Sequence, residues 1–207
     1  MNVAYSNLNG ISFYQTGGVT DTDYWQNGSN GGRNDAISPY TSSTVSNSPT
    51  GTDIIALQFA GTQTLTFSQT IANPVFSYVS LNGNGYAFDQ DFEILSFGDG
   101  SPPDVAGYWG PGTSYKSVVA LGGGNFEYQL LGTVEPHDTI RFTGAFDQVS
   151  WRSLSNENWN GFTVGIEGTA DEVFPPGAVP EPTTIVVWSL LGVAGAAIGY
   201  SKRRSAY

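Results

Sequence analysis

Three carboxylates fall at alternate positions in one predicted strand of this chain. Asp89, Asp91 and Glu93 would point to one face of that strand, with Phe88 and Phe92 nearer the other. Carboxylate oxygens of this kind bind Ca²⁺, and two of them could act as acid and base in glycoside hydrolysis. A solvated sheet face on an acidic protein would show the same pattern. Three interpretations stay open: a calcium site, a pair of catalytic carboxylates, or a plain polar face.

Aromatic side chains beside carboxylates and amides form a second candidate site. Tyr108 and Trp109 belong to a loop that also carries Asp99 and Asp104. An exposed ring can stack on the apolar face of a sugar while neighbouring polar groups bind its hydroxyls. Core packing or loop anchoring is the competing explanation for each ring. The candidate carbohydrate contacts are Trp25, Tyr108, Trp109 and Trp159.

Other kinds of catalytic site have little basis in the residues. His137 is the single histidine, follows a proline and is predicted to be a surface turn residue, and there is no cysteine. A catalytic triad or a histidine-based metal site would therefore lack partners. The chain also has no phosphate-binding loop and no dinucleotide fingerprint. A non-catalytic protein is favoured, and a carbohydrate-active enzyme that uses carboxylates alone is the alternative.

The elements that position these residues are predicted to be β-strands. Apolar and polar residues alternate in many short runs, and Gly, Asn and Pro are concentrated between the runs. We expect an all-β, two-sheet β-sandwich of jelly-roll type with nine or ten strands. The expected strands include 53–59, 75–81, 86–97, 115–121, 126–131 and 146–154, together with runs around Leu65, Ile140 and Val164.

The distribution of charge excludes one class of partner. The chain has 207 residues and a net charge of −11. Residues 1–178 hold 17 acids against four bases, a net charge of −13. Such a body repels phosphate backbones, so nucleic acid is not an expected partner.

The C-terminus has the composition of a membrane span. Residues 184–200 read TIVVWSLLGVAGAAIGY, 17 residues without a charge, which is the short end of the roughly 17–25 that cross a bilayer as a helix. Lys202, Arg203 and Arg204 follow, and positive flanks stay on the cytoplasmic side. The sequence predicts a single transmembrane helix with the body outside the cytoplasm. A buried core helix at the end of a soluble domain is the competing interpretation.

The tail resembles a known sorting signal. Val179, Pro180, Glu181 and Pro182 precede the apolar run, and the order of VPEP, span and basic cluster resembles the PEP-CTERM sorting domain, which is also catalogued as an ice-binding-protein C-terminal motif. The resemblance covers about residues 178–204. It implies recognition of the motif by an exosortase-type membrane peptidase, with Lys202–Arg204 as the stop-transfer signal.

The resemblance also implies where the protein acts. We expect an inner-membrane-anchored precursor that reaches the cell surface or extracellular matrix of a Gram-negative bacterium. There its β-sandwich would serve adhesion or exopolysaccharide association, or act purely as a structural coat component. Residues 1–18 contain neither the basic nor the apolar region of a signal peptide, so we expect that a signal sequence is missing here. A protein that is never exported is the alternative. The predicted organisation is a β-sandwich domain at 1–168, a linker at 169–178 and the sorting tail at 179–204.

Overall fold

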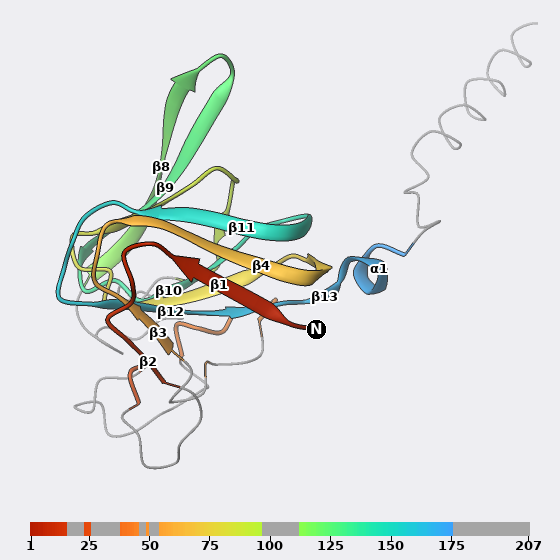
Figure 1. Ribbon diagram of the computed structural model, residues 1–207, viewed down its shortest axis with the longest axis horizontal. Coiled ribbons are helices and arrows are strands. Elements are labelled where there is room, and N and C mark those ends of the chain that lie inside the picture. The colour runs from red at the N-terminus through yellow and green to blue at the C-terminus, as the bar shows by residue number, and fades with distance from the viewer. Residues whose placement is uncertain (16–22, 26–37, 46–48, 50–53, 97–111, 176–207) are drawn as a thin grey trace, which may run out of the picture. The chain divides into compact units, whose positions relative to one another are not determined.

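The computed structural model describes residues 1–15, 23–25, 38–45, 49, 54–96 and 112–175 (Figure 1). The chain divides into two compact units, Met1–Val173 and Phe174–Tyr207. The regular elements in the described part of the first unit are thirteen β-strands and one short helix, as the alternating sequence pattern predicts.

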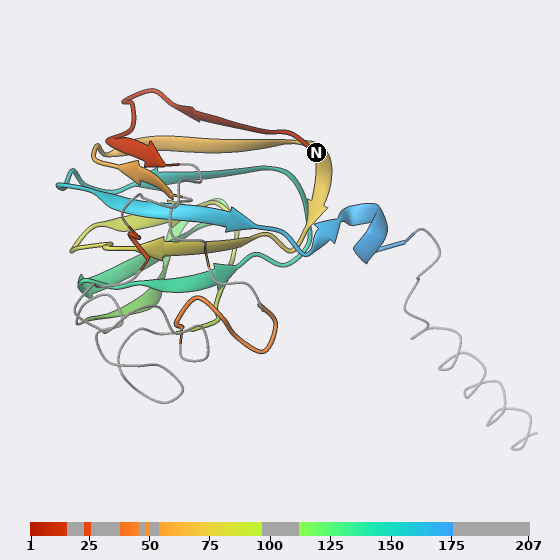
Figure 2. The same cartoon turned by 90° about the horizontal axis from the view of Figure 1, so that it is seen from below.

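The strands form two antiparallel sheets, and Figure 2 looks onto them with one sheet in front of the other. Sheet A has the order β1-β4-β11-β6-β9-β8, and β13 also pairs with β4. Sheet B has the order β2-β3-β12-β5-β10-β7. The strands of sheet A are β1 (Val3–Asn7), β4 (Gly61–Ala72), β6 (Gly85–Phe88), β8 (Gly112–Gly122), β9 (Asn125–Val134), β11 (Ala145–Ser153) and β13 (Gly168–Thr169). Those of sheet B are β2 (Phe13–Gln15), β3 (Ile54–Leu57), β5 (Val75–Val79), β7 (Glu93–Ile94), β10 (Asp138–Arg141) and β12 (Asn160–Gly165).

The central strand pairs are nested along the chain. β4 pairs with β11, β5 with β10 and β6 with β9, all antiparallel. Successive pairs alternate between sheet A and sheet B. The middle of the chain is therefore one long antiparallel ribbon folded over itself, so residues far apart in sequence share each layer.

The core lies between the two sheets and is rich in aromatic rings. In β4, Gln63, Leu65 and Phe67 are buried while the residues between them are more exposed, which confirms the predicted alternation. Trp151 of sheet A meets Phe162 of sheet B with ring centroids 4.9 Å apart and nearly perpendicular planes. Edge-to-face packing of this kind is favourable because a ring's positive edge meets a negative face.

The predicted strand over 86–97 is wrong in extent. β6 ends at Phe88 in sheet A, and β7 begins at Glu93 in sheet B, so residues 89–92 connect the two sheets. Phe88 and Phe92 are both buried, with ring centroids 5.5 Å apart. Because both rings pack into the core, the chain turns between the layers instead of continuing as one strand.

The first unit also extends beyond the predicted end at Gly168. Thr169 pairs with β4 as part of β13, and the short helix α1 (Ala170–Val173) follows. Part of the predicted linker 169–178 is therefore structured. Among the described residues no helix is long and apolar enough to cross a membrane. The predicted span 184–200 lies outside those residues.

Candidate functional site

The three predicted calcium ligands do not share one strand face. Asp89 and Asp91 lie on the connection between the sheets, whereas Glu93 belongs to β7. Asp91 forms an ion pair with Lys116, with 2.9 Å between Oδ1 and Nζ. Glu93 forms an ion pair with Arg141, with 2.8 Å between Oε2 and Nη2. Across the residues that the structure describes, no three His, Cys, Asp or Glu side chains form a group that could hold a metal ion. Two of the three carboxylates thus have a base as their partner.

The predicted carbohydrate contacts separate into three groups. Trp25 is only 1% exposed and packs edge-to-face on Tyr40, with ring centroids 5.1 Å apart. The prediction of a sugar-stacking surface is therefore wrong for Trp25, because its ring belongs to the core. Trp159 is half-buried and contacts Tyr24 at a centroid distance of 5.4 Å. Tyr108 and Trp109 lie outside the described residues.

His137 is buried, so the prediction of a surface turn residue is also wrong. Its Nδ1 lies 2.9 Å from the backbone oxygen of Glu135, and burial lowers the pKa of the imidazole. The sequence pattern misplaced it because a proline before a polar residue usually marks an exposed turn.

A buried polar cluster next to His137 joins the two sheets. Asp138 of β10 accepts hydrogen bonds from Tyr78 of β5 at 2.9 Å and from Ser114 of β8 at 2.5 Å. Burial raises the pKa of the Tyr78 hydroxyl, and the neighbouring carboxylate adds to this. These hydrogen bonds hold β8 against sheet B, so we interpret the cluster as structural.

A second polar cluster lies where the β11–β12 connection meets β6 and β12, and sequence reasoning missed it. The Tyr86 hydroxyl donates to Asn160 Oδ1, and Asn160 Nδ2 donates to Glu157 Oε1. Burial raises the pKa of Glu157 to about 8, and the charge of Glu135 contributes. The asparagines at 156, 158 and 160 around Glu157 were the sequence feature that could have indicated this cluster. A carboxyl that stays protonated near neutral pH can donate a proton or a hydrogen bond.

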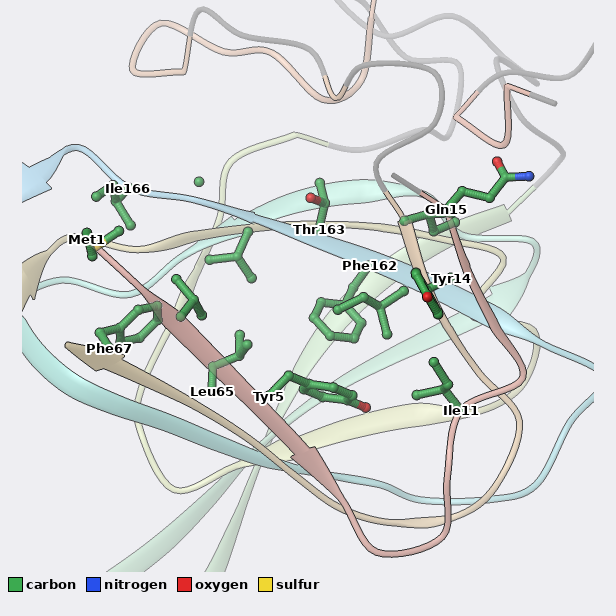
Figure 3. Close-up of a pocket in the computed structure, with 15 residues that line it drawn as sticks. Met1, Tyr5, Ile11, Tyr14, Gln15, Leu65, Phe67, Phe162, Thr163 and Ile166 are labelled. Carbon is green, nitrogen blue, oxygen red and sulfur yellow. The ribbon is translucent and has the colours of Figure 1, made fainter. Parts of the chain in front are cut away.

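An apolar cleft lies at one edge of the two sheets (Figure 3). It has a volume of about 630 Å³ and lies where the edge strands β1 and β2 end their sheets. Tyr5, Leu65 and Phe67 of sheet A and Phe162 of sheet B contribute rings and aliphatic chains to it. The remaining lining residues are Met1, Val3, Ile11, Tyr14, Gln15, Ile54, Ile55, Thr163, Val164, Gly165 and Ile166.

The cleft is lined mainly by apolar side chains. The Tyr5 hydroxyl donates to Gln63 at 2.6 Å, and burial raises the Tyr5 pKa to about 12, so it stays a neutral phenol. Gln15 Oε1 is buried and has no hydrogen-bond partner among the described residues. The cleft is therefore suited to an apolar molecule.

Comparisons with protein-family models, with curated proteins and with solved structures found no match to this chain. Its functional interpretation therefore depends on its own residues and geometry.

Proposed function

We propose that this chain is an exported, non-catalytic surface or matrix protein that is sorted through its C-terminal tail. The observation that carries the proposal is the three-part tail: the motif Val179–Pro182, the uncharged run 184–200 and the cations Lys202–Arg204. Two prolines disfavour a helix in the motif, which would suit binding by a peptidase as an extended segment, and Glu181 would supply a charge for recognition. The apolar run would hold the precursor in the inner membrane until an exosortase-type peptidase cleaves it.

The test is the fate of the tail in a host that has an exosortase. Mass spectrometry of the surface fraction should find the body without residues 185–207. Glu181→Gln should leave an uncleaved, membrane-associated precursor, whereas the control Glu172→Gln changes an exposed acid outside the motif and should be processed normally. A mature surface protein that keeps residues 185–207 would contradict the proposal.

We further propose that the body is a sandwich of jelly-roll type. The support is the nested pairing of β4 with β11, β5 with β10 and β6 with β9. A ribbon that is rolled so that its pairs alternate between two sheets has the strand order of a jelly roll. β8 does not follow this alternation between the sheets, because it pairs with its neighbour in sequence, β9, at the edge of sheet A.

Adhesion or exopolysaccharide association is the proposed role of this body, with a purely structural coat component as an alternative. The ion pairs of Asp91 and Glu93 argue against catalysis by these two carboxylates, since each already has a cationic partner. A glycan array on the full-length protein with and without Ca²⁺ tests the association. Binding that disappears in Trp159→Ala would support it, and the absence of binding to any glycan would favour the coat component.

The alternative of a carbohydrate-active enzyme has one supporting observation, the raised pKa of Glu157. A general acid in glycoside hydrolysis needs a carboxyl that stays protonated near neutral pH. An activity screen on polysaccharides separates the two classes. Turnover that is lost in Glu157→Gln but kept in Glu172→Gln would establish the enzyme and reject a non-catalytic body.

The apolar cleft favours a second candidate function, the binding of a small apolar molecule. Its volume lies within the range of roughly 300–1,000 Å³ that is typical of ligand pockets. The hydrophobic dye N-phenyl-1-naphthylamine is a suitable probe. Val3→Lys would place a charge in the cleft wall and should weaken dye binding, whereas Val134→Lys changes an exposed valine outside it. Equal dye binding by both variants would reject the cleft as a ligand site.

A further inference from the structure

The hairpin formed by β8 and β9 carries a concentration of exposed apolar side chains. In Figure 1 it rises away from the rest of the first unit. The two strands pair from Gly112 with Val134 to Gly122 with Asn125. The large hydrophobic residues exposed on it are Tyr115, Val118 (52%), Val119, Leu121 (62%), Phe126 (47%) and Val134.

These side chains occupy both faces of the hairpin. Ser114 is buried and bonds to Asp138 across the sheets, so Lys116 and Val118, at two-residue intervals, share its face. Tyr115, Val119 and the intervening Ser117 lie on the opposite face. In a monomeric protein an exposed sheet extension would carry polar residues on at least one face. Contiguous apolar exposure marks a surface that binds something.

Among the described strands, the outer edge of β8 carries little of the usual protection of an edge strand. β8 ends the order of sheet A and pairs only with β9 among the described strands, over 11 residues. Proteins block such edges with prolines or outward lysines, because an open row of N–H and C=O groups pairs with another chain. β8 has no proline and one lysine. Lys116 turns inward, donating to Asp91 and to the Phe92 carbonyl at 2.9 Å each and lying over the Phe92 ring.

Charge identifies which partner fits this edge. The hairpin, residues 112–134, holds two charged residues, Lys116 and Glu127, and each is already paired, with Asp91 and with Arg152. The rest of the body is strongly acidic. Two copies can therefore approach each other at the hairpins with little local repulsion, whereas their other acidic surfaces repel. An anionic lipid surface would find no free cation on the described hairpin.

We propose that β8 pairs with β8 of a second copy of this chain. The two strands run antiparallel about a twofold axis and join two A sheets into one continuous sheet. Such an interface is self-complementary, because each edge supplies the same alternation of donors and acceptors. The apolar side chains of the two β8 strands then lie side by side on each face of the joined sheet and shield one another laterally.

Cysteine cross-linking tests the pairing, because the chain has no native cysteine. Single-cysteine variants at positions 115–121 are made in the full-length protein and oxidised in mild detergent. Ser117→Cys or a close neighbour should form disulfide-linked dimers at least about tenfold faster than Leu8→Cys, because pairing holds two thiols together. Leu8 is 99% exposed and lies outside the hairpin. Rates at all seven positions that equal the Leu8→Cys rate would overturn the proposal.

A charge on the edge gives an independent check. Adding Val119→Lys to the fastest-linking variant, or Val118→Lys if position 119 links fastest, should lower its cross-linking to the rate of Leu8→Cys, since pairing would bring two lysines into the same short stretch of edge. Leu8→Lys makes the same change in net charge and should leave cross-linking unaltered. Near-ultraviolet circular dichroism shows that each variant is folded. If the hairpin instead enters phosphatidylcholine vesicles, an environment-sensitive dye on Leu121→Cys shifts to the blue while no dimer forms, and the proposal fails.

Discussion

At the scale of the residue, Trp151 illustrates how the aromatic core is held together. It is 2% exposed, and its ring contacts those of Phe76, Phe162 and Phe88. Its indole Nε1 is buried and has no hydrogen-bond partner among the described residues. The side chain therefore contributes volume and ring contacts, and its N–H contributes no stabilising bond.

We predict that Trp151→Ala lowers the free energy of unfolding by about 3–5 kcal/mol, as expected for a large ring removed from a core. Trp151→Phe should cost less than half as much, because it keeps a ring and removes the unpaired N–H. Urea denaturation of the full-length protein measures both. Equal losses for the two variants would show that the indole itself is required.

Glu157 gives a prediction about pH. Its pKa is about 8 in the folded protein against 4.5 in its ordinary environment, mainly through burial. Its contribution to stability is fully present below the unfolded pKa and is lost as the pH rises through the folded pKa, because ionisation leaves a partly buried charge. The free energy of unfolding should therefore fall between pH 5 and pH 8.5 in the native protein and fall less in Glu157→Gln. Glu172→Gln should keep the native slope. A native slope in Glu157→Gln would assign the effect to another group.

At the scale of the element, the base of the β8–β9 hairpin depends on a glycine. Gly112 has φ of +135°, and a Cβ placed there would lie 2.0 Å from the backbone oxygen of Thr133. Gly122, at the tip, has φ of +87° and nothing within 4 Å of such a Cβ. Both positions favour glycine by conformation, but only Gly112 is also crowded by backbone.

Alanine at these two positions separates the two effects. Gly122→Ala should lower the free energy of unfolding by about 1–2 kcal/mol, the usual penalty for a left-handed backbone with a side chain. Gly112→Ala should cost about 1–3 kcal/mol more, because the backbone must also shift. Thermal and urea unfolding measure the difference. Equal costs would show that the base of the hairpin relaxes freely.

At the scale of the whole molecule, the balance between charge and apolar surface governs association. The chain carries a net charge of −11, while the hairpin is neutral and apolar. Repulsion between two acidic bodies thus opposes the proposed pairing of their edge strands. Salt weakens repulsion between exposed charges over distances beyond the Debye length, which is about 10 Å at 0.1 M and about 3 Å at 1 M.

Dimer formation should accordingly increase with ionic strength. Raising NaCl from about 0.05 to 0.5 M should speed cross-linking of the hairpin cysteine variant, because screening removes repulsion and leaves apolar contacts intact. Leu8→Cys corrects for the general effect of salt on collisions and on the thiols. Slower cross-linking at high salt, relative to Leu8→Cys, would point to attraction between charges as the source of pairing.

Local pattern predicted most strands of this protein but not their partners. Alternation in the runs around Leu65, Val149 and Val164 reflects one buried and one exposed face, and each run is a strand. The prediction of one strand over 86–97 was wrong because both Phe88 and Phe92 are buried. In the sequence, a strand that ends and a chain that changes sheet then show the same alternation as one continuous strand. The acids between them therefore appeared to share one face.

The candidate sites depended on contacts that no local pattern contains. Trp25 and His137 are buried because distant segments cover them, and their sequence neighbours, acids and a proline, suggested exposure. Glu157 owes its raised pKa to burial and to Glu135, which lies in another connection. Composition and periodicity were sufficient for the strand content and the acidity, since these are properties of neighbouring residues, whereas the sorting tail stays a prediction. The pairing of strands, the apolar cleft and the edge position of β8 could be seen only in the tertiary structure. They depend on which segments far apart in sequence lie next to each other.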